Sequence, residues 1–292
     1  MLQNDQEEAD TKIFLCAAHA ATLGKEKALI TTVDSDVALY ACYFESRIPI
    51  SLYVSIGVKE RRRVIDVNEI VSEIGEECCS ALPALHAFTG NDYTSAFFGV
   101  GKGKAFKLLR ESEEFKKTFE KFGDSFTFDT KLFAAVEKFV CTLYGAKEAI
   151  DTDYARYQKF IAGKKSPEPQ KLPPTRDALL CHCKRVSFAT AMVKKSLYPF
   201  GDVPDPDGYG WSMIDDKLEI QWILRDPAPP EVLQLISCGC KKSKCSSRTC
   251  MCVSHGLVCT DLCSCNDCEN CSHQDDDDSS SSEESDQSDL DD

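Results

Sequence analysis

The sequence has no run of about eighteen apolar residues, the length that a membrane-spanning helix requires. Its first ten residues are polar and acidic, so we expect no secretory signal peptide there. A G-x4-G-K-S/T loop is also missing, and neither His19 nor His86 stands near a serine or cysteine arrangement typical of a nucleophile. These absences argue against a membrane-spanning protein, a P-loop nucleotide-binding protein and a serine or cysteine hydrolase.

Basic residues are missing from the last eighteen positions, 275–292, which hold ten carboxylates. This tail accounts for ten of the fourteen net negative charges of the 292-residue chain, and it includes a serine run at 279–282. Such a composition cannot bury apolar surface, so we expect 272–292 to be a disordered acidic tail. It is either a solubilising tail, a phosphorylated segment or a docking site for basic protein partners.

Cysteine is abundant, and ten of the seventeen cysteines fall between Cys238 and Cys271. They are spaced by repeated C-x-C and C-x2-C steps, and few apolar residues accompany them. Thiolates at such spacing can share a tetrahedral zinc ion, and metal binding would then supply most of the folding free energy of this segment. A disulfide knot is the alternative. We prefer zinc, because the remaining cysteines are scattered through apolar stretches in the manner of reduced thiols.

The first nine of these cysteines resemble, step for step, the CXC repeat of tesmin-like DNA-binding proteins. In that family nine thiolates hold three zinc ions, some sulfurs bridge two ions, and the module binds DNA. The sequence departs from the family at Thr249, where a DNA-contacting tyrosine is usual, and it carries one repeat where two are usual. The resemblance implies zinc ligands at Cys238, Cys240, Cys245, Cys250, Cys252, Cys259, Cys263, Cys265 and Cys268, and phosphate contacts from Lys241, Lys242 and Lys244.

The first half of the chain alternates strand-like and helix-like segments, which is typical of an α/β fold with a parallel sheet. Later segments have helical periodicity, and 199–236 is rich in proline and glycine. The patterns predict strands at 28–33 and 50–54, an undecided helix or strand at 37–44, and helices at 7–23, 67–75, 78–88, 101–110, 112–121, 129–144 and 176–198.

Acidic residues recur at three places where elements begin or end. Glu8 and Asp10 open the first helix, Asp34 and Asp36 follow the first strand, and Asp92 ends the helix 78–88. Oxygen ligands of this kind suit Mg²⁺ or Mn²⁺, and two such ions can drive phosphodiester hydrolysis. Each acid also has a simpler structural interpretation, as a charge at a helix N-terminus, an N-cap or a turn residue.

The order of these motifs, with Thr89-Gly-Asn-Asp-Tyr93 and Gly99-Val-Gly-Lys-Gly-Lys-Ala105, resembles the internal half of flap-endonuclease-type PIN-like nucleases. That resemblance implies a partial parallel sheet with a helix–turn–helix extension. It also implies metal-binding catalytic carboxylates at Glu8, Asp10, Asp34, Asp36 and Asp92, and a hairpin that grips the DNA backbone through Gly99, Gly101, Lys102 and Lys104. The family's earlier aspartates lie before its first matching helix, so either the chain is a shortened version or the hydrolytic chemistry has been lost.

The expected organisation is a nuclease-like domain at 1–145, a linker at 146–175, a helical or irregular spacer at 176–237 packed near the zinc module, that module at 238–271, and the tail. Three functions stay open: a divalent-metal nuclease of structured DNA, an inactive nuclease scaffold that binds DNA or chromatin and is of mobile-element origin, and a protein-interaction adaptor. Reduced thiols, a zinc module and an acidic tail predict a nuclear protein, or otherwise a cytoplasmic one.

Overall fold

The computed structural model describes residues 3–6, 8–162, 168–225, 236–241, 243–259, 263–266 and 268–271. The chain divides into two compact units, Met1–Leu224 and Arg225–Asp292, and each is described by itself. The acidic tail expected at 272–292 lies outside the described residues, and so does Lys242. In the parts of the chain that are described, no helix combines the length and apolar character needed to cross a membrane.

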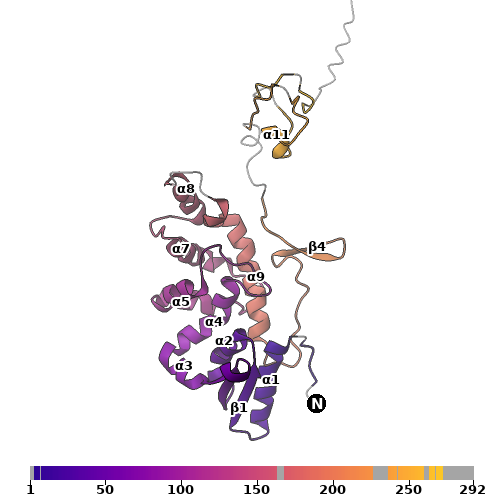
Figure 1. The fold of residues 1–292 in the computed structure, drawn as a ribbon. Helices are drawn as coiled ribbons and strands as arrows, with labels where there is room; N and C mark the ends of the chain where they lie inside the picture. Colours follow the sequence, from indigo (N-terminus) through magenta and orange to yellow (C-terminus); the bar gives the residue numbers. More distant parts are fainter. Residues whose placement is uncertain are drawn as a thin grey trace, which may run out of the picture. The chain divides into compact units, whose positions relative to one another are not determined.

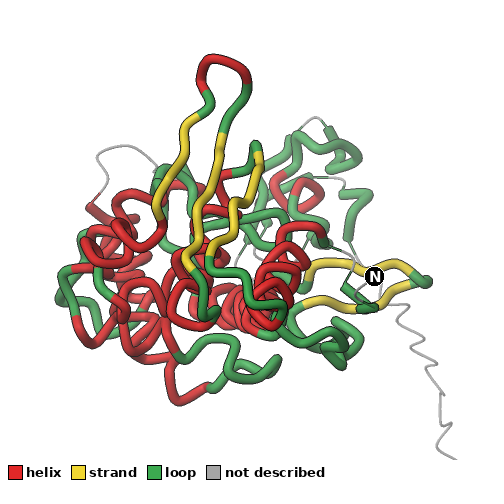
Figure 2. The backbone as a smooth tube through the Cα atoms, turned by 90° about the horizontal axis from the view of Figure 1, so that it is seen from below, coloured by secondary structure: helices red, strands yellow, loops and turns green. Residues whose placement is uncertain are grey.

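A three-stranded sheet lies at one end of the first unit, in the order β1 (Lys27–Thr32), β2 (Ser51–Ile56), β3 (Arg63–Asp66). Strands β1 and β2 are parallel, and Ile30 stands opposite Val54. Strand β3 runs antiparallel to β2, which it joins through a turn containing the 3-10 helix η2 (Lys59–Arg61), visible in Figure 2 as the loop that extends away from the helices. The expected parallel pairing is confirmed for β1 and β2, and the sheet is mixed because a short turn can only return the chain antiparallel.

Helices α1 (Ala9–Thr22), α2 (Ser35–Phe44) and α3 (Val67–Ile74) pack with this sheet. The undecided segment 37–44 is therefore helical. Polar side chains fix where α2 and α3 begin, since Asp34 accepts a hydrogen bond from the backbone N–H of Asp36 and Asp66 accepts one from that of Asn68. Phe14, Val37 and Val54, each at most 1% exposed, form the centre of the core between helices and sheet.

A helical half follows the sheet half, and its described helices are α4 (Glu76–Phe88), α5 (Lys102–Arg110), α6 (Glu113–Glu120), α7 (Phe133–Leu143), α8 (Thr152–Ala162) and α9 (Arg176–Lys194) (Figure 1). Their core is rich in phenylalanine, with Phe88 in ring contact with Phe119, Phe122 and Phe139. Helix α4 packs against α2, α6 and α9 and so connects the sheet half to the helical half.

Two expected boundaries differ from the structure. The segment 146–175, expected as a linker, contains α8, which packs on α7 and is anchored by the buried residues Thr152 and Ala155. The proline- and lysine-rich composition at 163–175 predicted a linker, and α8 itself has few buried residues that would have indicated a packed helix.

The segment expected as a spacer also belongs to the first unit as far as Leu224. Helix α9 buries Leu179, Cys183 and Val186 in the phenylalanine-rich core. After it come two antiparallel strands, β4 (Trp211–Ile214) and β5 (Lys217–Ile220), and Trp211 packs against Phe188 of α9. Within the first unit this stretch contacts α9 and also the segment before α1, where the backbone N–H of Gly201 donates to the Asp5 carboxylate. The expected packing of this stretch near the zinc module stays a prediction.

The second unit has little regular structure. Its one described helix is α11 (Met251–Ser254), and the backbones of Cys259 and Cys271 pair as an isolated parallel β-bridge. Its core consists of cysteines with a few apolar neighbours, among them Ile236, Val253 and Leu257. A core this small is consistent with a segment that depends on bound metal for its stability.

Candidate functional site

The cysteine module holds its thiols at the spacing of a zinc tetrahedron. The Sγ atom of Cys238 lies 3.6 Å from that of Cys245 and 3.7 Å from that of Cys259, and the Sγ atoms of Cys250 and Cys259 are 4.0 Å apart. A tetrahedral ion with Zn–S bonds of about 2.3 Å separates its sulfurs by about 3.8 Å. The sulfur atoms could therefore bind zinc with little rearrangement.

Several cysteines belong to more than one potential metal site. In three groups of four, all Sγ atoms lie within 4.8 Å of one another, and Cys238 belongs to every group. Cys245, Cys250 and Cys259 belong to two groups each. Such sharing is what a multi-zinc cluster requires, because three four-coordinate ions need more sulfur–metal bonds than nine thiolates supply singly. The groups are Cys238/Cys240/Cys245/Cys250, Cys238/Cys250/Cys252/Cys259 and Cys238/Cys245/Cys259/Cys265.

The remaining expected ligands lie at the edge of these groups. Cys263 Sγ is 3.5 Å from Cys252 Sγ and accepts a hydrogen bond from the backbone N–H of Cys238. Cys268 is packed against the same core. Cys271, the tenth cysteine, instead donates from its Sγ to the carbonyl of Cys268 and belongs to none of the three groups. Seven of the nine predicted ligands thus belong to the three groups, Cys263 and Cys268 lie beside them, and Cys271 belongs to none.

Crowding opposes ionisation of several of these thiols. Desolvation first, and neighbouring thiols second, raise the pKa of Cys252 and Cys265 above the usual thiol value. Cys250 is the exception, because a hydrogen bond from the backbone of Val253 is the main cause that lowers its pKa to about 6. A bound divalent cation would supply the positive charge that several adjacent thiolates need.

The basic residues of this module that the structure describes are at its surface. Lys241 and Lys244 are exposed, and Lys244 Nζ lies 3.7 Å from a carboxylate oxygen of Glu269 with both side chains more than half exposed. An ion pair this exposed contributes little stability, so it leaves Lys244 available to another anion. Lys242, the third predicted phosphate contact, lies outside the described residues.

Four of the five carboxylates predicted from the first unit line a second feature, a small pocket of about 50 Å³. Glu8 and Asp10 reach it from the start of α1, Asp36 from the first turn of α2, and Asp92 from the turn after α4. Burial is the main cause that raises the pKa of Asp10, and the charges of the other four predicted acids, Asp34 included, raise it further. The acids are therefore close enough to repel one another electrostatically.

Asp34 has a separate structural role. Its Oδ1 accepts the backbone N–H of Asp36 at 2.9 Å, and its own N–H donates to Thr32 Oγ1, so it is the N-cap of α2. It does not line the pocket. Moreover, within the described residues the groups of three or more metal-ligand atoms within 4.8 Å of one another consist of cysteines. The carboxylates share a pocket, but their oxygens stand farther apart than the ligands of a single ion.

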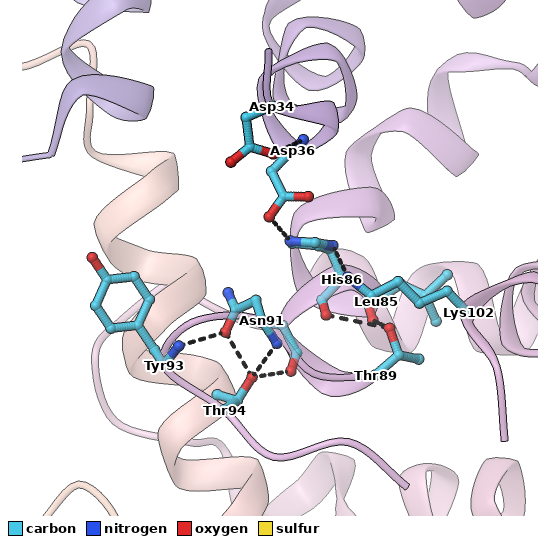
Figure 3. Close-up of polar contacts among 10 residues, drawn as sticks. Asp34, Asp36, Leu85, His86, Thr89, Asn91, Tyr93, Thr94 and Lys102 are labelled. Carbon is cyan, nitrogen blue, oxygen red and sulfur yellow. Dashed lines mark hydrogen bonds and ion pairs between the residues drawn. The ribbon is translucent and has the colours of Figure 1, made fainter. Parts of the chain in front are cut away.

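Asp36 belongs to a chain of polar contacts that passes through the buried His86 (Figure 3). Lys102 Nζ donates to His86 Nδ1 at 2.9 Å, because an ammonium group can only donate. The Nε2–H of the same ring then donates to Asp36 Oδ2 at 2.8 Å. His86 is 3% exposed, and burial is the main cause that lowers its pKa, so the ring is neutral. The histidine expected as a packing residue is thus also the link between Asp36 and Lys102.

The lysines predicted to contact DNA on this unit are turned toward the protein. Lys102 contacts His86, and Lys104 Nζ donates to the carbonyl of Leu143 at 2.6 Å, where it caps the C-terminal end of α7. Gly99 adopts a φ of +71° and Gly101 is the N-cap of α5, so both belong to the turn that starts α5. The glycines are exposed, whereas the two ammonium groups have partners within the protein.

Two tyrosines complete the acidic pocket and had no assigned role in the sequence patterns. Tyr93 Oη donates to Glu8 Oε1 at 2.5 Å, and Tyr40 lies against Asp36. Asn91 shapes the turn by accepting hydrogen bonds from the backbone N–H of Tyr93 and from the hydroxyl of Thr94 (Figure 3). Tyr93 and Asn91 belong to the motif 89–93, so the sequence could have indicated that they lie near the site. No local sequence pattern indicated Tyr40.

Comparison with known proteins identifies one part of the chain. Residues 235–272 match the Tesmin/TSO1-like CXC domain, a cysteine-rich domain. No curated protein and no solved structure matches the chain. The chain therefore contains a CXC cysteine-rich domain whose clustered thiols are compatible with structural zinc, and this domain follows a mixed α/β unit with a small sheet and many helices.

Proposed function

We propose that the protein binds DNA or chromatin through its zinc-loaded CXC domain. The observation that carries the proposal is the thiol cluster of the second unit, which coincides with the segment matching the CXC domain. Zinc would fold this segment, and the folded segment would present Lys241, Lys242 and Lys244 to phosphates. A nuclear location follows from this activity as part of the same proposal.

Charge limits where the DNA can lie. Nine thiolates and three zinc ions would leave a negatively charged cluster, so the phosphates must approach the exposed lysines and avoid the sulfur core. Each phosphate neutralised by a lysine releases counterions, which makes the affinity fall as the salt concentration rises. The salt dependence therefore reports how many lysines touch the backbone.

The test is fluorescence anisotropy of the zinc-loaded full chain on labelled duplex DNA at several salt concentrations. The triple variant Lys241→Glu, Lys242→Glu, Lys244→Glu should weaken binding, and its log K against log [salt] slope should become shallower by roughly 0.9 for each lysine that no longer neutralises a phosphate. The matched control changes the exposed lysines Lys25, Lys147 and Lys217 of the first unit to glutamate. Equal weakening of DNA binding by both variants would mean that only the net charge of the protein matters, and would reject the proposal that the CXC lysines contact DNA.

A second function is favoured by the acidic pocket: binding of Mg²⁺ or Mn²⁺, with phosphodiester hydrolysis in the manner of a PIN-like nuclease. The supporting observation is that four acids from three separate elements line one pocket, and that the charges of the other acids add to burial in raising the pKa of Asp10. A divalent cation would relieve this repulsion and draw the carboxylates together. Glu8, Asp10, Asp36 and Asp92 would hold it, with Asp34 fixing the start of α2.

Binding and cleavage are separable by experiment. Calorimetry with Mg²⁺ or Mn²⁺ tests the ion, and incubation with flap, hairpin and duplex DNA tests hydrolysis. We expect the double variant Asp10→Asn, Asp92→Asn to abolish both, while Glu73→Gln, which removes an exposed carboxylate of α3, changes neither. Ion binding without cleavage would favour the inactive nuclease-like scaffold, and absence of ion binding would reject this second function.

A further inference from the structure

A buried arginine in the first unit has no carboxylate partner among the residues that the structure describes. Arg185 of α9 is 2% exposed, and its Nη1 donates to the carbonyls of Gly210 and Gln221, each at 2.9 Å. Its Nε is buried without a hydrogen-bond acceptor among the described residues. Burial lowers the pKa of the guanidinium, and the groups that oppose this are thiols, Cys181 and Cys183. A buried cation of this kind is costly unless a counter-charge reaches it.

Arg185 is one of the residues that line a cavity of about 130 Å³. The other walls are apolar or small, among them Phe97, Leu179, Ala178 and Ser95, and Trp222 lies at the rim with its ring centroid 5.7 Å from the guanidinium. Trp222 is 59% exposed, so the cavity has an aromatic side chain in contact with solvent. The volume corresponds to a few water molecules or a small organic molecule.

The neighbouring histidine adds no charge to this cavity. His182 Nε2 donates to the carbonyl of Phe88 at 2.9 Å, and burial lowers the pKa of His182 to about 4. Among the residues that line the cavity, Arg185 is therefore the one charged side chain. The cavity combines a single buried positive charge with apolar and aromatic walls.

We propose that this cavity binds a small carboxylate with an apolar or aromatic body, held by the Arg185 guanidinium. A carboxylate matches the planar donors of arginine and would provide an acceptor for the unpartnered Nε. The apolar body would lie against Phe97 and Leu179, with Trp222 covering it from the solvent side. This site uses none of the residues of the CXC domain or of the acidic pocket, so it stands independently of the proposed function.

Benzoate is the probe, and benzamide is its neutral control of nearly the same shape. We expect benzoate to change the tryptophan fluorescence of the full chain in a saturable manner and to raise its melting temperature, because it binds the native state alone. Benzamide should do neither. The chain has two tryptophans, and Trp222→Phe should remove the fluorescence change while the shift in melting temperature persists. Equal responses to both compounds would overturn the proposal, and so would stronger binding of inorganic phosphate than of benzoate.

A substitution of Arg185 would also remove its hydrogen bonds to the carbonyls of Gly210 and Gln221 and could disturb the fold. The decisive variant therefore leaves Arg185 in place. Ala178→Met on α9 should fill the cavity and abolish the benzoate response, while Ala134→Met, on the exposed face of α7, should leave it intact. Ser95→Leu should fill the cavity from another wall, and it replaces Ala178→Met as the test if Ala178→Met lowers the melting temperature strongly. A benzoate response of wild-type size in a folded cavity-filled variant would overturn the site.

Discussion

Asp10 illustrates how one residue is affected by acids far away in the sequence. Its pKa is raised by burial and then by Asp34, Glu8, Asp36 and Asp92. Because the folded-state pKa lies above the ordinary value, the native state holds the proton more tightly than the unfolded chain does. The ionised carboxylate therefore opposes folding at neutral pH, and this cost shrinks as the pH falls through the raised pKa and is gone below 3.8.

We accordingly expect Asp10→Asn to stabilise the protein at pH 7 by about 0.5 kcal/mol in the absence of divalent cations, since partly exposed charges interact on this scale. The gain should shrink as the pH falls through the raised pKa toward 3.8. Urea unfolding at pH 7 and pH 4 measures it, and Glu73→Gln is the control. A destabilised Asp10→Asn variant at pH 7 would mean that the acids do not repel one another as placed.

His86 makes the folding stability depend on pH in the opposite direction, and at a higher pH than Asp10 does. Its pKa is lowered from 6.5, so the native state binds the proton less readily than the unfolded chain, and stability is lost as the pH falls below 6.5. The charged group opposite Nδ1 is Lys102, and those near Nε2 are Asp36 and Asp34. We expect His86→Gln to be less stable than wild type at pH 7.5 but to lose less stability between pH 7.5 and 5.5.

The measurement is urea unfolding at both pH values with His19→Gln, an exposed histidine on α1, as the matched control. The control should keep the pH dependence of the wild type. If His86→Gln keeps it as well, the neutral ring between Lys102 and Asp36 is not what makes the protein sensitive in this range.

At the scale of elements, α4 connects the two halves of the first unit, and Phe88 at its end is completely buried among phenylalanines from α6 and α7. Phe88→Ala removes a whole ring from this core, so we expect a loss of about 3–5 kcal/mol in the free energy of unfolding. Phe98→Ala, at a position 54% exposed, should cost less than about 0.5 kcal/mol. Denaturant unfolding of the two variants measures the difference, and similar losses would contradict the assigned core.

Local patterns were sufficient for most elements and failed at α8. The bounds of α3, α4, α5 and α9 differ from the sequence expectation by at most a few residues, because each carries its own apolar periodicity and end signals. Helix α8 has few buried positions, Thr152 and Ala155, and neither stands out as apolar in the sequence. Its place in the fold depends on Glu137 of α7, which pairs with Arg176 and lies next to Thr152.

At the scale of the whole molecule, the two units have cores of different chemistry. The first is held by apolar side chains and the second by a cysteine cluster. Removing zinc with a chelator should therefore unfold the second unit while the first keeps its helical circular dichroism and its cooperative melting. Limited proteolysis with and without chelator checks this. After zinc removal, we expect new cleavage sites only in the second unit, after residue 224. A protected CXC segment without metal would contradict the proposal of zinc-dependent folding.

The same cluster predicts unequal roles for its cysteines. Cys238 belongs to all three thiol groups and Cys271 to none. By native mass spectrometry we expect about three zinc ions in the wild type and in Cys271→Ser, and a loss of one or more in Cys238→Ser. Equal zinc content in the two variants would show that Cys238 is not shared between zinc sites.

The sequence by itself determined what depends on neighbours along the chain. The C-x-C and C-x2-C steps are short enough to predict a zinc module, and the alternation of apolar segments predicts the strands β1 and β2 with their helices. These features follow from spacing and periodicity, which local backbone geometry converts directly into structure.

Only the tertiary structure decided which distant residues meet. It joined Asp36, His86 and Lys102 into one chain, turned Lys104 onto the end of α7, and left Arg185 facing a cavity without a carboxylate. It also kept the oxygens of the acidic pocket farther apart than a single ion's ligands. The direction of a long side chain depends on which acceptors and charges the packed elements bring near it, and no spacing within one segment encodes that.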